Sequence, residues 1–285
     1  MISVILAMRD STQAIDAQLK ALARQTYRGC WELVVVDNGS TEKSCAIAAT
    51  WQARIPNMRL INGPSHPLGP GAAKNLGARH ARGDTLVFCD HDDVVRDGWL
   101  EAMAETMMSA DLAGGGVEYG TLNPPGSAPV DGGTLVGLPV ALSFMPFTIG
   151  ANMAVSRRAF DHVGGFREER PWGGVDVDLA WRLQLAGYRI NFVPHAIIDK
   201  RARHRTIDLW RQHANWGRCC VDLYRRYQHA GMRRRSMIRV AASYARLIVW
   251  LPRCLTANGR RRWVRDAAVR WGCLVESGRS RTLYL

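Results

Sequence analysis

The sequence lacks the cysteine pattern of a zinc finger or of a disulfide-stapled domain. Its seven cysteines are an odd number, and no pair has the C-x-x-C spacing of structural zinc sites. A chain of 285 residues can bury a sufficient core without such cross-links. The cysteines are therefore typical of a protein in a reducing compartment, and we expect a cytoplasmic location.

Long apolar runs are also missing. The run at residues 2–8 has no preceding basic residue and no small-residue cleavage site, so it predicts a strand and not a signal peptide. The longest apolar run near the end, residues 247–251, is far shorter than the roughly 20 residues that span a bilayer. We therefore expect no transmembrane helix.

Two common nucleotide-binding fingerprints are absent as well. No G-x-G-x-x-G follows the first strand-like run, and no Walker A pattern occurs anywhere. Residues 69–74 read G-x-G-x-x-K, but they follow the third strand-like run. These absences remove the main support for an ordinary dehydrogenase or a kinase.

Acidic residues are scarce in the last third of the chain. Residues 200–285 hold 21 Lys and Arg against four acids, a net charge of +17, whereas residues 1–199 carry −4. Such a split indicates an anionic partner for the basic part, or arginines that only decorate solvated helix faces. Of the possible anionic partners we expect an anionic membrane before nucleic acid.

Strand-like and helical patterns alternate along the first half of the chain. The expected strands are residues 2–8, 33–36, 58–61 and 85–89, and the expected helices are residues 11–25, a helix capped by Ser40 or Thr41, and residues 71–82 and 175–186. Alternation of this kind predicts an α/β fold with a mostly parallel sheet covered on both faces. From residue 207 the chain reads as Arg-rich helices, one at 236–251, with breaks near Gly231 and at Asn258 and Gly259. We therefore divide the chain into a catalytic domain, 1–203, and a helical region, 204–285.

Carboxylates follow three of the expected strands. Asp10 follows the first, Asp37 the second, and Asp90-His91-Asp92-Asp93 the fourth. Ligands of such sheets bind beyond the carboxyl ends of the strands, so these side chains should share one edge. Three carboxylates in four residues repel one another unless a cation lies among them, and Mg²⁺ or Mn²⁺ prefers such oxygen ligands. The pattern predicts a metal-assisted nucleoside diphosphate site, to which Lys74 adds positive charge.

The order of these motifs resembles the inverting nucleotide-sugar glycosyltransferases of the GT-A fold, family 2. The matching segments are residues 3–10, 25–27, 31–40, 69–84, 88–93, 98–101, 163–166 and 176–179. The resemblance implies a Rossmann-like GT-A domain with a helical, basic C-terminal region. It also implies transfer of a sugar from a nucleoside diphosphate sugar to a hydroxyl acceptor.

Roles for individual residues follow from the same resemblance. Asp37 is expected at the nucleobase, and Ala7, Arg9, Lys74 and Asp90 are expected beside the rest of the nucleotide. Asp92, with Asp90, is expected to hold Mn²⁺ or Mg²⁺. Asp176 falls on the position of the catalytic base, which removes a proton from the acceptor hydroxyl.

The chain departs from the family pattern at two positions. Val175 stands where a Glu commonly precedes the base, which leaves Asp178 as an alternative base. Lys200 stands where a metal-ligating His is common, with His195 and His204 on either side of it. The metal site is therefore carboxylate and water alone, with Lys200 adding charge near the diphosphate, or it recruits one of these histidines.

Two alternative functions remain open from the sequence. A nucleotidyltransferase shares metal carboxylates on an α/β sheet, and a degenerate family member could act as a scaffold that binds anionic lipid or nucleic acid.

The segment 236–251 carries an apolar face formed by Ile238, Ala241, Ala242, Ala245, Leu247 and Ile248. That face predicts peripheral docking on the inner face of an anionic membrane, or packing against the catalytic domain or a second subunit of a homodimer.

Overall fold

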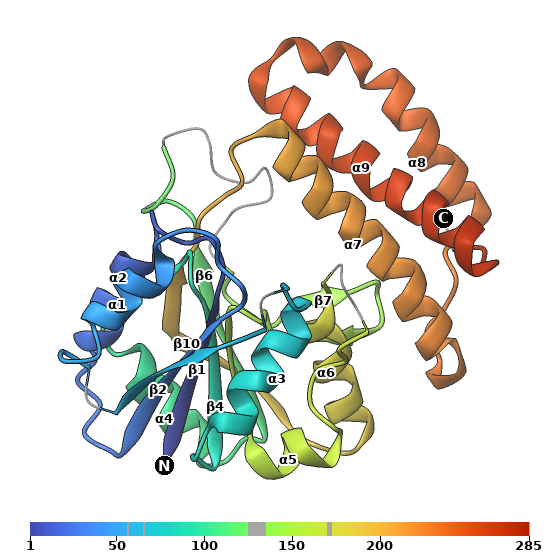
Figure 1. Ribbon diagram of the computed structural model, residues 1–285. Coiled ribbons are helices and arrows are strands. Elements are labelled where there is room, and N and C mark those ends of the chain that lie inside the picture. Colours follow the sequence, from blue (N-terminus) through green and yellow to red (C-terminus); the bar gives the residue numbers. More distant parts are fainter. Residues whose placement is uncertain (56, 65, 125–134, 170–172, 285) are drawn as a thin grey trace.

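A computed structural model describes residues 1–55, 57–64, 66–124, 135–169 and 173–284. Its centre is an eight-stranded sheet with helices on both faces (Figure 1). The strands are β1 (Ile2–Met8), β2 (Trp31–Asp37), β3 (Met58–Asn62), β4 (Thr85–Asp90), β5 (Val94–Val95), β6 (Leu112–Glu118), β9 (Asn152–Ser156) and β10 (Ile190–Asp199), with a separate pair β7 (Val140–Ala141) and β8 (Met145–Pro146). The Pro- and Gly-rich segment 122–148 lies partly outside the described residues.

The strand order is β3-β2-β1-β4-β9-β6-β10-β5. β1 pairs in parallel with β2 and β4, β2 pairs in parallel with β3, and β10 pairs in parallel with β6. β9 runs antiparallel between β4 and β6. The prediction of a mostly parallel α/β sheet is confirmed.

The helices of the catalytic domain cover the two faces of the sheet. They are α1 (Ile15–Ala23), α2 (Ser44–Thr50), α3 (Pro70–His80), α4 (Trp99–Met107), α5 (Arg157–His162) and α6 (Val175–Leu185). Alternate side chains of β1 point to opposite faces of the sheet. Val4 belongs to the same hydrophobic cluster as Leu19 of α1, and Ile5 belongs to the same cluster as Leu179 of α6. Burial on both faces explains the almost unbroken apolar sequence of the central strands.

Two helices begin later than predicted. α1 begins at Ile15 and not at residue 11, and α2 begins at Ser44 and not after Ser40 or Thr41. The backbone N–H of Ser40 donates to Asp37 instead, and that of Thr41 donates to Asp10. These residues therefore tie two loops together at the carboxyl edge and do not cap a helix.

The C-terminal region consists of α7 (Thr206–Tyr227), α8 (Met237–Val249) and α9 (Ala257–Ser280), with short 3₁₀ turns η1 (Gln228–Ala230) and η2 (Leu251–Leu255). α9 lies between α7 and α8 (Figure 1). The expected break at Gly231 is confirmed, but Asn258 and Gly259 lie in the first turn of α9, and η2 makes the break. Among the described helices, none combines the length and the hydropathy needed to cross a bilayer.

The helical region shares a hydrophobic cluster with the catalytic domain. Trp181 of α6 is fully buried and packs edge-on against Tyr227 of α7, with ring centroids 5.1 Å apart. Gly174, which precedes α6, has φ +68°, and a Cβ there would lie 2.0 Å from the Cys219 sulfur of α7. The division at 203/204 stays a prediction, and the two parts pack directly beside the expected base.

Candidate active site at the carboxyl edge

Strand register brings the predicted nucleotide residues together. Ala7 of β1 is paired with Val36 on one side and with Asp90 on the other, and Met8 is paired with Asp37. Ala7, Asp37 and Asp90 therefore lie side by side at the carboxyl ends of three adjacent strands. Arg9 follows directly, is exposed, and forms an ion pair of 3.5 Å with Asp10.

Asp37 is the last residue of β2 at this edge of the sheet. It is almost fully buried, and its carboxylate accepts hydrogen bonds of 3.3 Å from the backbone N–H of Ser40. Burial, together with the adjacent Asp37, raises the pKa of the Cys45 thiol to about 11, so this thiol stays protonated beside the carboxylate. The Asp37 carboxylate is thus fixed in place as an acceptor for a ligand.

The turn after β4 gathers the acidic cluster. Asp90, Asp92 and Asp93 have carboxylate oxygens that all lie within 4.8 Å of one another. Gln18 of α1 supports the turn, because its amide donates to the carbonyl of Asp90 and accepts from the N–H of Val95. The predicted convergence of three carboxylates is therefore present and held by a side chain from another helix.

Each carboxylate of the cluster has its own cationic partner. Lys74 lies 3.0 Å from Asp90, and Lys200 lies 2.5 Å from Asp93. The third pair joins the Arg203 guanidinium to Asp92 at 3.1 Å. The three pairs together make the site close to electrically neutral.

The same charges shift the pKa values in this cluster. Burial would raise the pKa of Asp90, but Lys74 and Lys200 outweigh it and hold that pKa well below its usual range. Burial would likewise lower the pKa of Lys200, but the three aspartates outweigh it and raise that pKa. Lys200 therefore carries its charge at neutral pH, and Asp90 stays ionised.

The cluster fits a divalent cation through Asp92 and Asp90. All the donors are carboxylate oxygens, the type that Mg²⁺ and Mn²⁺ prefer. The Arg203 side chain that pairs with Asp92 is 52% exposed, so it can swing into solvent when a cation takes its place. Asp93 is different, because it is buried and also accepts from the backbone N–H of Arg201.

The two histidine alternatives do not join this cluster. His195 and His204 are both exposed, and within the described part of the chain the group of close ligand atoms holds only the three aspartates. Lys200 lies among them in place of a histidine. An arrangement of carboxylates with Lys200 beside them is the one the structure contains.

Asp176 lies in the first turn of α6 and is linked to the acidic cluster through Gly150. Its carboxylate accepts a 2.8 Å hydrogen bond from the N–H of Gly150. The carbonyl of Gly150 accepts from the Lys74 ammonium, which also donates to Asp90. A Cβ at Gly150 would lie 3.3 Å from both the Asp176 carboxylate and the Lys74 nitrogen. The expected base and the expected metal site thus belong to one continuous network.

Asp178, the alternative base, is engaged elsewhere. It is fully buried, it pairs with Arg182 at 2.8 Å and Arg167 at 3.2 Å, and it accepts from the Tyr227 hydroxyl at 2.9 Å. These contacts hold α6 against the loop before it and against α7. Asp178 therefore has the environment of a structural ion pair, whereas Asp176 is only half-buried.

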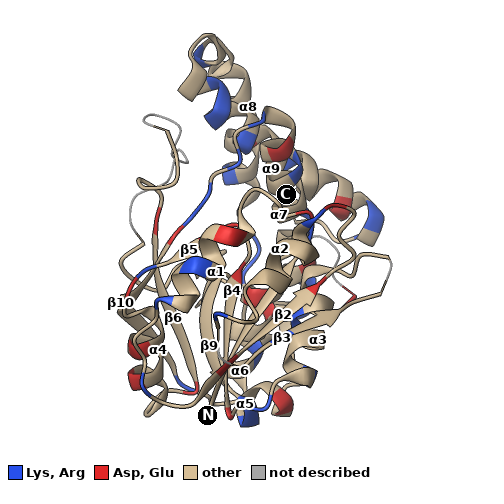
Figure 2. Ribbon diagram, turned by 60° about the vertical axis from the view of Figure 1, so that its left-hand side comes forward, with Lys and Arg blue, Asp and Glu red and all other residues tan. Residues whose placement is uncertain are grey.

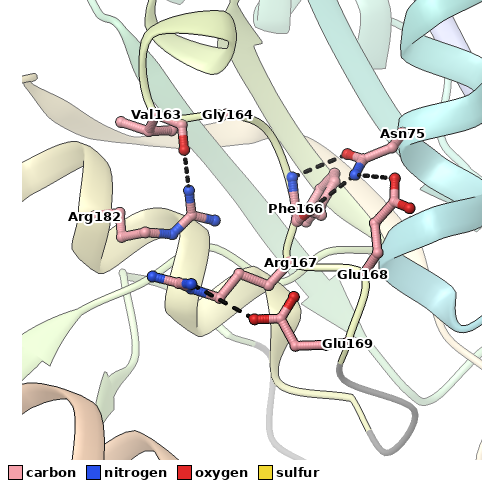
Figure 3. Close-up of a pocket in the computed structure, with 8 residues that line it drawn as sticks. All are labelled: Asn75, Val163, Gly164, Phe166, Arg167, Glu168, Glu169 and Arg182. Atoms are coloured by element: carbon pink, nitrogen blue, oxygen red, sulfur yellow. Dashed lines mark hydrogen bonds and ion pairs between the residues drawn. The ribbon is translucent and has the colours of Figure 1, made fainter.

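A cavity of about 340 Å³ lies among α3, α6 and the loop before α6 (Figure 3). It is lined by Asn75, Val163, Gly164, Phe166, Arg167, Glu168, Glu169 and Arg182. The Asn75 side chain accepts from the N–H of Phe166 and donates to its carbonyl and to Glu168. None of the predicted site residues lines this cavity. Its polar contacts hold the loop before α6 against α3, the helix that carries Lys74.

Sequence reasoning missed two members of the site. No motif of the sequence gives Gly150 a role, and Arg203 is in sequence only one of the 21 basic residues of 200–285. A small residue just before a buried strand is a weak signal for Gly150. For Arg203 the only signal is its place three residues after Lys200.

Comparison with solved structures shows a shared fold. A mannosyltransferase from Pyrobaculum calidifontis, solved in complex with GDP-Man and Mn²⁺, matches 96% of this chain and 86% of its own at a TM-score of 0.66 and 18% identity. S. aureus TarS 1–349, solved in complex with UDP-GlcNAc, matches 100% and 93% at a TM-score of 0.56 and 17% identity. The expected GT-A fold is confirmed.

Curated relatives match over part of their length. Glycosyltransferase AglE of Haloferax volcanii is 30% identical over 201 residues, which cover 69% of this chain and 65% of AglE. The pre-mycofactocin glycosyltransferase of Mycobacterium tuberculosis is 26% identical over 232 residues, which cover 78% of this chain and 47% of that protein. The chain thus spans less than two thirds of the length of these relatives.

Two family models match the chain. The model described as glycosyl transferase family group 2 matches residues 85–264. The model of glycosyl transferase family 2 matches residues 3–164, which include Ala7, Arg9, Asp37, Lys74, Asp90 and Asp92. Together with the fold and the acidic cluster, these matches show that the chain belongs to glycosyl transferase family 2.

Proposed function

We propose that the chain transfers a sugar from a nucleoside diphosphate sugar to a hydroxyl acceptor, with inversion and with the help of Mn²⁺ or Mg²⁺. The observation that carries the proposal is the network from Asp90 through Lys74 and Gly150 to Asp176. It joins a cation and phosphate site to a half-buried carboxylate. One network would thus supply both the groups that stabilise the leaving diphosphate and the base that activates the acceptor hydroxyl.

The donor end uses the residues at the carboxyl edge. The fixed carboxylate of Asp37 accepts from the base or ribose, and Ala7 and Arg9 border the same space. Asp92 and Asp90 would hold the divalent cation, which would supply positive charge to stabilise the leaving diphosphate. Lys74 and Lys200 place two further positive charges beside it.

The acceptor end uses Asp176. Its carboxylate takes the proton of the acceptor hydroxyl as the oxygen bonds to the sugar carbon and the diphosphate leaves from the opposite face. One displacement of this kind inverts the anomeric configuration. The hydrogen bond from Gly150 orients the carboxylate, and Lys74 couples that position to the donor.

Titration calorimetry with UDP and GDP tests the metal site. Either nucleotide should bind more tightly with Mn²⁺ than with EDTA, and Asp92→Asn should remove most of that gain, at least about tenfold in affinity, because even partners of metal ligands typically contribute 10–100-fold. Asp97→Asn, on the exposed side chain that pairs with Arg24, is the matched control and should behave as wild type.

The outcomes separate the candidate functions. Equal affinity with Mn²⁺ and with EDTA for both nucleotides would contradict a metal-dependent site. Metal-dependent binding without cleavage of any nucleotide sugar would instead favour a scaffold that has kept the ligand site and lost transfer.

A further inference from the structure

The outward face of α8 is apolar and uncovered. Its exposed side chains are Met237, Ile238, Ala241, Ala242, Ala245, Ile248 and Val249. Spacings of three and four residues place them on one side of the helix. Ile238 is 81% exposed, Ile248 76% and Val249 72%. The prediction that this apolar face packs against the catalytic domain is wrong.

The opposite face of α8 is the one that packs. Val240 is buried, the Tyr244 hydroxyl donates to the carbonyl of Arg270 at 3.3 Å, and Arg270 donates to Ser243. The Trp263 indole N–H of α9 donates to the carbonyl of Leu247 at 2.8 Å. α8 is thus held in place by α9 and lies on the outer side of it (Figure 1), while its apolar face is exposed.

The charge around this face is of one sign. Residues 231–262 contain nine arginines and no acidic residue. Arg239 and Arg246, seven residues apart, lie along one border of the apolar face. At the end of the helix, Arg246 and Arg253 stack on Trp250 at 4.8 and 4.3 Å. Figure 2 shows blue segments along α8 and on the neighbouring stretch of α9.

We propose that α8 docks the protein on an anionic lipid bilayer, lying in the plane of its interface. The aliphatic face would enter the boundary of the acyl chains, and the arginines beside it would contact anionic headgroups. Leu251 and Leu255 of η2, 55% and 89% exposed, extend the apolar surface beyond the helix. At 13 residues α8 is about 20 Å long, which suits a helix on the surface and not across a bilayer.

Two other occupants fit these observations less well. A second copy of the chain joined through α8 about a two-fold axis would bring the nine arginines of each copy together without an acidic residue to pair with them. Nucleic acid would satisfy the arginines but would leave the isoleucines and Val249 in water. A bilayer satisfies both the apolar and the basic parts of the surface.

Vesicle sedimentation of the full chain tests the proposal. Phosphatidylcholine vesicles with about one third phosphatidylglycerol should pull the protein down at low salt, and pure phosphatidylcholine should pull down much less. High salt should release much of the bound protein, because the headgroup attraction is screened. The double variant Ile238→Glu/Ile248→Glu should bind at least about tenfold more weakly.

The matched control is Met108→Glu/Leu185→Glu, which changes exposed apolar side chains on α4's end and on α6. It should sediment as wild type does. Arg239→Gln/Arg246→Gln should weaken binding to anionic vesicles alone, which checks the charge contribution with the apolar face intact.

Wild-type protein that stays in the supernatant would overturn the proposal. An equal loss of vesicle binding in the α8 variant and in the control would overturn it as well. Light scattering that shows a dimer dissolved by the α8 variant would also overturn it, in favour of a second copy.

Discussion

At the residue scale, neighbouring carboxylates of the same type have different environments. Asp176 is half-buried, and its carboxylate accepts from the backbone N–H groups of Gly150 and Val177. Asp178, two residues further along α6, is fully buried between two arginines and a tyrosine hydroxyl. A general base must reach the acceptor, and a fully paired carboxylate inside the protein is a poor candidate for that role. These environments support our proposal that Asp176 is the base, and they give Asp178 the contacts of a structural ion pair.

This assignment predicts opposite effects for two matched substitutions. Asp176→Asn should lower transfer by on the order of 10²–10⁴, the typical contribution of a general base, with nucleotide affinity and melting temperature unchanged. Asp178→Asn should lower the free energy of unfolding by about 3 kcal/mol or more, because it removes one member of a buried ion pair. Transfer rates, calorimetry and thermal unfolding of both variants check this. Wild-type turnover of Asp176→Asn would show that another group is the base.

At the element scale, the helical region depends on glycines that let helices approach closely. A Cβ at Gly272 of α9 would lie 2.0 Å from the carbonyl oxygen of Ala214 in α7, and one at Gly217 would lie 2.1 Å from the carbonyl oxygen of Val269. Backbone atoms cannot move aside as a flexible side chain can. The α7–α9 pair, which supports α8, therefore requires small residues at the crossing.

Gly272→Ala should lower the free energy of unfolding by about 1–3 kcal/mol, as overpacking of a tight contact does. Gly278→Ala is the matched control, because it lies in the same helix and a Cβ there meets nothing within 4 Å. The control should be neutral or stabilising by about 0.5–1 kcal/mol. Denaturant unfolding measures both values, and equal effects of the two changes would contradict the crossing described above.

The elements also differ in how far the sequence predicts them. β1, β2, β3 and β4 follow from their β-branched and apolar runs, and the acidic cluster follows from the strand that precedes it. β6 was missed, because its sequence L-A-G-G-G-V-E has three glycines and few strand-forming side chains. Close packing requires glycine in this strand, since a Cβ at Gly115 would lie 2.1 Å from the carbonyl oxygen of Ala196 in β10. Because this steric constraint comes from a strand distant in the sequence, no local sequence pattern predicts it.

Long-range pairing limits the prediction of the site in the same way. The residues after β1, β2 and β4 could be placed on one edge from the alternation of strands and helices alone. The pairing of Arg203 with Asp92, and the position of Gly150 between Asp176 and Lys74, depend on how segments about 25 to 110 residues apart pack together. The burial that separates Asp178 from Asp176 comes from α7 and from the loop before α6, which the sequence does not place.

At the scale of the whole molecule, net charge and exposed apolar surface differ between the first 199 residues and the last 86. The first 199 residues, with a net charge of −4, carry the acidic cluster, and the last 86, at +17, carry the exposed face of α8. α7 connects the two, because it packs on α6 beside Asp176 and on α9 behind α8. If α8 docks as proposed, α7 would connect the bilayer surface with the side of the catalytic domain that carries Asp176.

We propose that the sugar carbon undergoes one displacement, with Asp176 on the side of the acceptor and the leaving diphosphate on the opposite side. The anomeric configuration of the first sugar product tests this proposal most directly. Proton NMR monitors that configuration from the start of the reaction. The donor is the nucleoside diphosphate sugar that the wild-type chain cleaves fastest. A single displacement predicts the anomer opposite to that of the donor. A first product that keeps the donor's configuration would contradict the claim.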